Sequence, residues 1–496
     1  MSISRRTFLT GSAGGLATAA ALGPIELLQA EEARRSNSPN EKLGFAVVGS
    51  RGQGRNHLNM LSGLVDVEVL YVCDVDEQIG QERTDEVAQK TGRRPRYVKD
   101  FRQALDDPAV DCVTTATPHH WHALVSIWSM QAGKDVYVEK PLAHNVWEGR
   151  QTVRAAQSLG RICQCGTQIR SSSGIAAAVQ YVRSGELGKT QYVVGTCYKG
   201  RKPIGRLDEP YKIPSHIDYD LWCGPSQKVD LYRPRLHYDW HWDFNTGNGD
   251  MGNQGIHQMD VARWFLGTDH LSPRVISIGG RLGYEDYRDA GNTPNTQIAY
   301  HDYPAAPLIF ETRGMPSSKA AQTGNWRGQT DNYRGSEIGV LVQCEKGYVL
   351  VHTYSSATAF DNDGETIKTW EGGGSHFANF IDAVRSRKPE DLNANALEGH
   401  LSSGLCHTGA ISHQVGQQLT AKEIAGTLED YPLLAEPFDR MVEHLRANEV
   451  AVDRPTITLG PWLEMDPKTE TFTNHSDANS FLAREYRQSF VVPEMG

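Results

Sequence analysis

A glycine-rich turn near the start of the sequence has the composition of a phosphate-binding site. An apolar run at 43–48 leads into Gly49-Ser50-Arg51-Gly52-Gln53-Gly54, and a segment that can form a helix follows. Glycines let a backbone approach a pyrophosphate, and free N–H groups at a helix N-terminus favour anions. Arg51 replaces the second glycine of the usual G-x-G-x-x-G pattern, so the turn alone leaves a simple tight turn open.

An acidic residue after the next apolar run supports the nucleotide interpretation. Asp74 follows residues 67–73, at about the distance from the turn at which dinucleotide-binding units carry an acid. A carboxylate there accepts hydrogen bonds from the adenosine ribose and repels a 2′-phosphate. The sequence therefore predicts NAD as the cofactor, with NADP as the less favoured one.

A second group of reactive side chains lies near the middle of the chain. His257 and Asp260 are three residues apart, so on a helix they share a face and could pair. A histidine with an ordinary pKa near 6.5 suits proton transfer at neutral pH.

Several further side chains are candidates for binding a carbohydrate. Trp240 and Trp242 could stack on the C–H face of a pyranose. The alternative is that both rings pack in the core or at an interface. Contacts to substrate are also expected from residues at predicted strand ends or just after them, namely Gln168, Tyr198 and Lys199.

The elements that must position these groups follow a regular order in the first half. Strand-like runs at 111–118 and 135–138 alternate with helical stretches, which predicts a parallel, doubly wound sheet. Ligands of such sheets bind beyond the carboxyl ends of the strands, where Pro118 and Lys140 lie. The second half predicts a mostly antiparallel open sheet, from five apolar runs at 275–278, 296–300, 308–312, 340–343 and 348–353.

Taken in order, these motifs resemble a known family. Glu139-Lys140-Pro141, Thr117-Pro118 with His122, and Gly255-x-His257-x-x-Asp260 join the glycine turn and Asp74. Nearly all of the chain after residues 1–30 is similar to the glucose-fructose oxidoreductase / inositol dehydrogenase / MocA (Gfo/Idh/MocA) family of NAD(P)-dependent sugar and cyclitol oxidoreductases. The resemblance implies an N-terminal Rossmann domain and a C-terminal α+β domain with a large open sheet.

The resemblance also assigns roles to individual residues. It implies that Lys140 lies beside the nicotinamide and the substrate hydroxyl, with Glu139 near the cofactor and a cis bond before Pro141. It implies that His122 supports the nicotinamide pocket. Cofactor contacts are then expected from Gly49, Ser50, Arg51, Gly52, Gln53, Gly54, Asp74, Thr117, Pro118, His122, Glu139 and Lys140.

One residue departs from the family pattern. Asn253 stands where the family has an aspartate ahead of the histidine. An amide can position a hydroxyl but cannot ionise, so the proton would pass to His257 with Lys140, or to the nearby Asp250. Catalytic roles are therefore expected for Lys140, His257 and Asn253, the last two also binding substrate.

The N-terminus predicts export. Arg5-Arg6 precedes an apolar stretch rich in alanine and glycine, as in twin-arginine signals. The expected organisation is a signal at 1–30, a linker at 31–42, an NAD-binding domain at 43–165, a substrate and oligomerisation domain at 166–452 and a tail at 453–496. Two helices near 376–417 should close onto the first domain. The expected location is the periplasm or cell envelope, where the cofactor would have to stay bound.

Composition excludes several classes of protein. The net charge of −10 offers no basic excess for nucleic acid, and no apolar run after the signal is long enough for a membrane span. Eight cysteines without Cys-x-x-Cys spacing predict no metal site.

The leading functional hypothesis is hydride transfer between nicotinamide and a secondary hydroxyl of a sugar, glycoside or cyclitol. A redox-neutral, NAD-dependent glycoside hydrolase is the first alternative, and a sugar-binding protein without catalysis is the second. A homo-oligomer is expected, formed through the far face of the second sheet.

Overall fold

The computed structural model describes residues 42–284 and 287–496, and the predicted signal lies outside them. The first half forms a six-stranded parallel sheet in the order β3-β2-β1-β4-β5-β6. Its strands are β1 (Leu43–Val48), β2 (Val67–Cys73), β3 (Arg96–Val98), β4 (Cys112–Thr115), β5 (Asp135–Val138) and β6 (Cys163–Cys165). This is the strand order of a dinucleotide-binding fold, so the prediction of a doubly wound sheet is confirmed.

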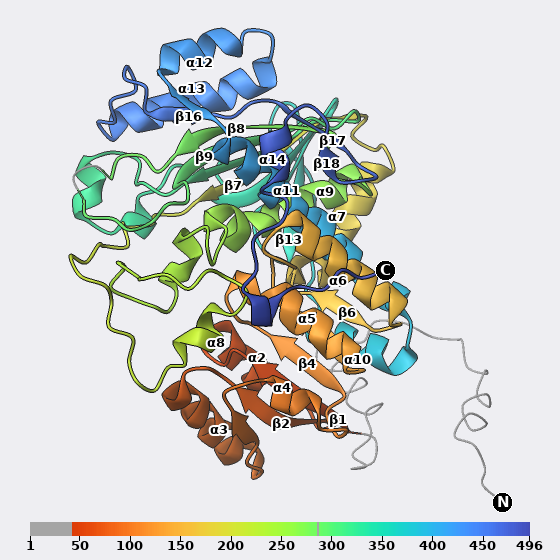
Figure 1. Ribbon diagram of the computed structural model, residues 1–496. Coiled ribbons are helices and arrows are strands. Elements are labelled where there is room, and N and C mark those ends of the chain that lie inside the picture. The colour runs from red at the N-terminus through yellow and green to blue at the C-terminus, as the bar shows by residue number, and fades with distance from the viewer. Residues whose placement is uncertain (1–41, 285–286) are drawn as a thin grey trace, which may run out of the picture.

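Helices from the first half and one from much later in the chain cover this sheet (Figure 1). The local helices are α2 (Gln53–Leu61), α3 (Glu77–Thr91), α4 (Arg102–Leu105), α5 (His122–Gln131) and α6 (Val146–Ser158). The distant one is α10 (His376–Ser386), whose Phe377 stacks on Tyr137 of β5 with ring centroids 4.1 Å apart. The first domain therefore depends on a helix from the second half to bury its sheet.

The second half builds a larger mixed sheet above the first domain (Figure 1). Its strand order is β14-β13-β12-β11-β7-β10-β9-β8-β16-β15, and every pair along it is antiparallel except β7 with β10. The expected runs appear as β8 (Arg274–Gly280), β9 (Thr296–His301), β10 (Leu308–Arg313), β11 (Ile338–Cys344) and β12 (Gly347–Val351), beside β7 (Thr190–Tyr198).

The sheet also contains strands that apolar periodicity did not reveal. These are β13 (Ser356–Asp361), β14 (Thr366–Glu371), β15 (Gln417–Leu419), β16 (Ile457–Leu459), β17 (Leu463–Asp466) and β18 (Thr471–Phe472). Because β16 pairs with β8, the segment after 453 is partly built into the sheet and is not only a tail. Its last residues return to the first domain, where Phe490 packs edge-on against Trp121.

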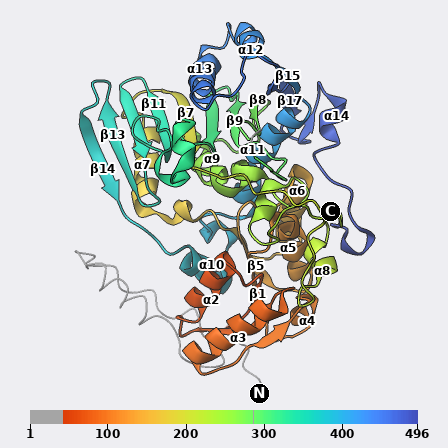
Figure 2. The ribbon, with the colours of Figure 1, turned by 90° about the vertical axis from the view of Figure 1, so that its left-hand side faces the viewer.

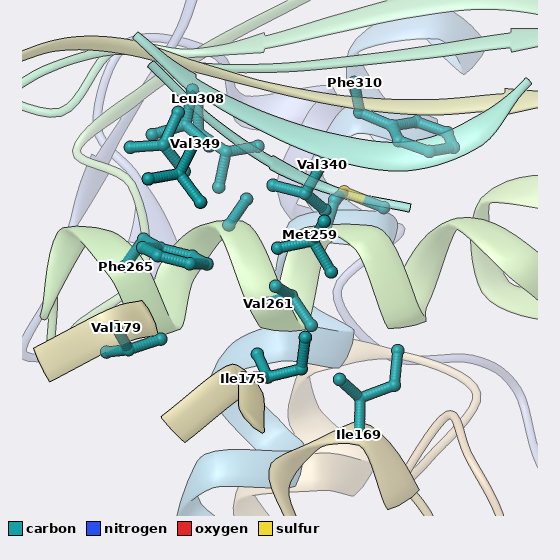
Figure 3. Packing of buried hydrophobic residues seen from close by; sticks show 14 of the residues in the cluster. Ile169, Ile175, Val179, Met259, Val261, Phe265, Leu308, Phe310, Val340 and Val349 are labelled. Carbon is teal, nitrogen blue, oxygen red and sulfur yellow. The ribbon is translucent and has the colours of Figure 1, made fainter. Parts of the chain in front are cut away.

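Three helices pack on the inner face of the large sheet. They are α7 (Ser173–Arg183), α9 (Ile256–Leu266) and α11 (Ala396–Gln414). Figure 3 shows side chains of α9, such as Met259 and Phe265, between the sheet residues Leu308 and Val349 and the helical residues Ile175 and Val179. This core fixes the start of α9, where His257 lies.

The outer face of the same sheet is partly covered by the chain itself. Helices α12 (Ala421–Thr427) and α13 (Pro432–Ala447) lie over it (Figures 1 and 2). Phe438 and Leu445 of α13 pack with Ile276 and Ile309. The sequence-based expectation that this face is open to a second copy therefore fails where α13 lies. In the described part of the chain, no helix has both the length and the apolarity to cross a membrane.

Candidate active site

The glycine turn between β1 and α2 has the backbone shape that a phosphate cradle requires. Gly49 has φ of 77°, in the left-handed region that favours glycine. A Cβ on Gly54 would lie 1.8 Å from the carbonyl oxygen of Gly49, so no other residue fits there. The turn therefore brings bare backbone to the N-terminus of α2, and the side chain of Arg51 is exposed beside it.

Asp74 holds this turn in place from the end of β2. Its carboxylate accepts hydrogen bonds from Ser50, 2.7 Å from the backbone nitrogen and 2.8 Å from Oγ, and one from the backbone of Asp76 at 3.0 Å. Burial raises the pKa of Asp74, while these hydrogen bonds oppose the shift. The sequence predicted Asp74 as a ribose acceptor and did not reveal its contact with Ser50.

An apolar slot opens beside Asp74, between the ends of β1, β2 and β4. Its walls include Phe101, Pro118, Trp121 and Trp222. These residues fit NAD, because a flat apolar slot suits an adenine ring, Asp74 suits a ribose and the glycine turn suits the pyrophosphate. The fit requires no metal, and the described residues hold no cluster of three or more metal-binding side chains.

A long arm of the second domain, residues 201–246, reaches down over this slot. His237 Nε2 lies 3.0 Å from a carboxylate oxygen of Asp76. Trp121 donates its indole N–H to the carbonyl of Leu221 in α8 (Tyr219–Cys223) at 3.0 Å. Arg487 from the last residues of the chain pairs with Asp220 at 2.5 Å. The arm therefore forms one wall of the cofactor slot and is held there by both domains.

Lys140 lies at the carboxyl end of β5, where it meets the second domain. Its Nζ donates a 2.6 Å hydrogen bond to the backbone carbonyl of Asn253. Burial lowers the pKa of Lys140, although the charge of Glu139 opposes this. The bond between Lys140 and Pro141 is cis, as expected.

Glu139 is held by a set of donors. Its carboxylate contacts His57 Nε2 at 3.2 Å, Gln53 Nε2 at 3.2 Å and Gln168 Nε2 at 3.0 Å. Desolvation is outweighed by the hydrogen bond and charge of His57, which lower the pKa of Glu139 to about 2. Glu139 is therefore a fixed negative charge next to Lys140. No motif pointed to His57, which is fully buried in α2.

His257 and Asn253 come together at the start of α9. Asn253 belongs to a π-helical turn, η5 (Met251–Gly255), and a turn of this type is common at functional sites. Among the described residues, His257 Nδ1 is buried with no hydrogen-bond partner. Burial, with the charge of Lys140, lowers the pKa of His257 to about 3. His257 is therefore neutral at pH 7 and is a weaker base than the sequence suggested.

The two acids expected near His257 have other partners. Asp260 accepts hydrogen bonds from Arg170 Nε at 2.9 Å and from Ser402 Oγ at 2.6 Å, and no hydrogen bond or ion pair joins it to His257 in the described chain. Asp250 forms a buried ion pair with Arg201 at 2.7 Å. Both carboxylates are neutralised by arginines, so neither is free to accept the substrate proton.

The predicted substrate residues divide between the site and other positions. Tyr198 is buried on the outer side of the sheet, where its hydroxyl donates to Glu311 at 2.8 Å, so it does not face the site. The side-chain amide of Gln168 donates a hydrogen bond to the carboxylate of Glu139 at 3.0 Å. Lys199 lies on the site side, with Nζ 3.5 Å from Gln254 Oε1.

The two tryptophans also differ. Trp240 is half-buried, stacks on His241 with centroids 3.6 Å apart, and meets His119 edge-on at 4.8 Å. Trp242 is buried beneath Arg201, which lies 5.0 Å from its ring, and so serves packing. Of these two tryptophans, Trp240 is therefore the one that can contact a substrate.

His122 links the two loops from which cofactor contacts are expected. Its Nδ1 lies 2.6 Å from the carbonyl oxygen of Pro141, and its Nε2 lies 2.9 Å from that of Thr117. The ring therefore spans the loops that follow β4 and β5. Support of the nicotinamide pocket by His122 stays a prediction, and these contacts are compatible with it.

Two family models match the chain. Residues 43–167 match the model described as "Oxidoreductase family, NAD-binding Rossmann fold", of the Gfo/Idh/MocA type. Residues 192–320 match the model of the same family described as "Oxidoreductase family, C-terminal alpha/beta domain". The two matched segments together make up just over half of the chain.

Individual relatives agree with this assignment. The scyllo-inositol 2-dehydrogenase (NAD(+)) of Bacillus subtilis is 32% identical over 258 residues, which are 52% of this chain and 63% of the relative. A glycosyl hydrolase family 109 protein of Shewanella pealeana is 31% identical over 152 residues, 30% of this chain and 33% of the relative. The chain thus spans less than two thirds of the length of either relative.

A solved structure has the same fold. The WlbA dehydrogenase of Bordetella pertussis, in complex with NADH and UDP-GlcNAcA, has a TM-score of 0.53 at 18% identity, covering 75% of this chain and 96% of that one. The likeness extends through both domains of the fold. The chain belongs to the Gfo/Idh/MocA oxidoreductase family, and its first domain is the NAD-binding Rossmann domain of that family.

Proposed function

We propose that the protein transfers a hydride between bound NAD and a secondary hydroxyl of a sugar, glycoside or cyclitol. The observation that carries this proposal is the contact between Lys140 at the end of β5 and the Asn253 carbonyl ahead of α9. It brings the amine of the nucleotide domain to the turn just before α9, the helix that carries His257. The scyllo-inositol dehydrogenase among the relatives supports the same class of substrate.

Lys140 is the group best suited to manage the hydroxyl proton. Burial lowers its pKa, so a larger fraction of the amine is neutral at a given pH than for a solvated lysine. A neutral amine accepts the proton of a hydroxyl, and the ammonium returns it in the reverse direction. NAD, when bound, supplies the acceptor or donor of the hydride.

His257 and Asn253 position the hydroxyl in this scheme. With a pKa of about 3, His257 is a neutral imidazole at pH 7 and can both donate and accept a hydrogen bond. The amide of Asn253 is partly exposed and can do the same. Asp250 is excluded as the base because Arg201 holds its carboxylate.

The cofactor remains bound through turnover in this proposal. The arm at 201–246 walls the slot beside Asp74 and is anchored through Asp76 and through Arg487. Retention suits a protein exported by the twin-arginine route to the periplasm or cell envelope, which is part of the same proposal. Loss of NAD on dialysis of the purified protein, measured by mass spectrometry of the denatured sample, would contradict retention.

A redox-neutral glycoside hydrolase is the second candidate. It is favoured by the family 109 relative, whose alignment is limited to 152 residues. In that reaction the sugar is oxidised to a ketone, the leaving group is eliminated, water adds and the ketone is reduced. Elimination requires one further proton acceptor near the reacting carbon.

The near-ultraviolet absorbance of the purified protein separates these candidates. We expect reduced nicotinamide to accumulate when one member of a panel of sugars, glycosides and cyclitols is added. A transient signal with release of free sugar would favour the hydrolase. No response from any compound, with NAD supplied, would contradict both and favour a binding protein.

A further inference from the structure

A cavity of about 210 Å³ adjoins His257 on the side of the large sheet. It lies between the first two turns of α9, the start of β11 and the end of β12. His257 is one wall of it, and the ring of Tyr354 lies 5.3 Å from the imidazole at its rim. The catalytic mechanism above makes no use of this space.

Most of the surface that faces the cavity is apolar, although polar side chains also line it. The apolar part is lined by Ile169, Val261, Ile338, Val340 and Val351. Figure 3 shows Ile169, Val261 and Val340 on three different elements, with the first two near each other below the sheet. The polar side chains of the lining include Gln254, His257, Gln258, His352, Thr353 and Tyr354.

The cavity lies next to the proposed active site, because His257 lines it and two more of its residues adjoin residues of the site in the sequence. Ile169 follows Gln168, whose amide binds Glu139. Gln254 follows Asn253, whose carbonyl binds Lys140, and Gln254 itself donates to the Tyr354 hydroxyl at 3.2 Å. A substituent held in the cavity would therefore be attached to the substrate close to its reacting carbon, where Lys140 and His257 act.

We propose that this cavity binds an apolar, ring-sized substituent of the substrate, so that the preferred substrate is a glycoside with an aromatic aglycone. The inference rests on the proposed function. Sugar hydroxyls buried against isoleucine and valine would lose hydrogen bonds to water, whereas an aromatic ring gains from leaving water. The size agrees, because an apolar cavity of about 150 Å³ is large enough to bind benzene.

Matched glycosides test the preference directly. Phenyl and methyl glycosides of the same sugars would be compared by the rate of NAD reduction. We expect the second-order rate constant for reduction of the bound NAD, at low glycoside concentration, to be at least about tenfold higher for the phenyl compound, as for other apolar groups that fill a pocket. Equal values for the pair would overturn the proposal.

An aspartate in the cavity provides the structural control. Ile338→Asp places a charge in the aliphatic wall and should abolish the preference for phenyl over methyl while NAD reduction with the methyl glycoside persists. Ile367→Asp is the matched variant, because Ile367 is 46% exposed on β14 and is not part of the lining. It should leave the preference unchanged. Loss of the preference in both variants would contradict the assignment to this cavity.

A probe without a sugar separates the cavity from the proposed reaction. Fluorine NMR of 4-fluorophenol should show binding to the wild-type protein and at least about tenfold weaker binding to Ile338→Asp. If the probe binds in this way but no glycoside reduces NAD, the proposed function fails and the cavity assignment stands. If glycosides reduce NAD but the probe binds both proteins equally, or neither, the cavity assignment fails.

Discussion

Lys140 Nζ donates a 2.6 Å hydrogen bond to the backbone carbonyl of Asn253, which joins the end of a strand in one domain to the turn before a helix in the other. The carbonyl accepts a hydrogen bond from the amine but does not take up its proton. A carboxylate at this point would stabilise the ammonium and raise the pKa of the lysine. The contact therefore positions Lys140 while leaving its pKa lowered by burial.

The first prediction concerns Lys140 itself. Lys140→Arg keeps a positive charge but removes a group that can accept a proton, since arginine stays protonated. We expect the rate of NAD reduction in a single turnover to fall by about 10²- to 10⁴-fold, the range for general acid–base groups. In the wild type the rate should rise with pH and level off below the usual pKa of a lysine. An unchanged rate in Lys140→Arg, with bound NAD intact, would contradict this role.

A second prediction concerns the choice of cofactor. Asp74 presents a carboxylate at the slot, and this charge repels a 2′-phosphate. Asp74→Ser should lower the ratio of the affinity for NAD to that for NADP by at least about tenfold, measured by titration of protein stripped of its cofactor. Affinity for both cofactors should also fall, because Ser50 loses its acceptor. The test is the ratio, and a ratio that stays the same would show that selectivity arises elsewhere.

A third prediction separates structure from catalysis at Asp260. Asp260 and Arg170 form a buried pair, and Arg170 also pairs with the partly buried Glu398, so removing Asp260 leaves the arginine with one carboxylate instead of two. Asp260→Ala should reduce the free energy of unfolding by about 1.5–3 kcal/mol, the range for hydrogen bonds to charged groups, measured by urea denaturation. Asp363→Ala, at an exposed loop position, should change it by no more than about 0.5 kcal/mol. A pH–rate profile that shifts in Asp260→Ala would instead indicate a direct role with His257.

The fourth prediction is that stability falls on mild acidification. Burial lowers the pKa of His301 to about 3, and those of His120 and His407 to about 3 as well. Their pKa is near 6.5 in the unfolded chain, so between pH 6.5 and 3 the unfolded state binds more protons. The free energy of unfolding must then decrease as pH falls through this window.

His301→Leu tests this linkage at one position. It should reduce the slope of unfolding free energy against pH by up to one proton, or about 1.4 kcal/mol per pH unit. The measurement is urea denaturation at several pH values between 7 and about 4. An identical slope in wild type and variant would show that His301 titrates alike in both states.

Much of the first domain could be predicted because its signals are local. The turn at Gly49 needs a positive φ, the acid Asp74 ends a strand, and the alternation of strand and helix fixes a parallel sheet. The turn and the order of the strands follow from residues that are near one another in the sequence. The fully buried His57, which holds Glu139, gave no such signal, because its partner is distant in the chain.

The second domain was harder to predict, because its contacts join residues that are distant in the sequence. They also depend on which face of a strand or helix each residue occupies. Tyr198 and Lys199 were both expected to face the substrate, yet adjacent strand residues point to opposite sides of a sheet, so they could not both do so. Helical spacing alone indicated that Asp260 could pair with His257. Helix α9 is buried almost all round, so Arg170 and Ser402 reach Asp260 from other elements.

In the proposed reaction, the reacting hydrogen leaves a carbinol carbon of the substrate as a hydride. The most direct test of this step uses the compound that reduces NAD, prepared with deuterium on its carbinol carbons, and mass spectrometry of the cofactor after one turnover. We expect deuterium in the reduced cofactor and a slower reaction than with the unlabelled compound. Reduced cofactor without deuterium, formed at an unchanged rate, would contradict it.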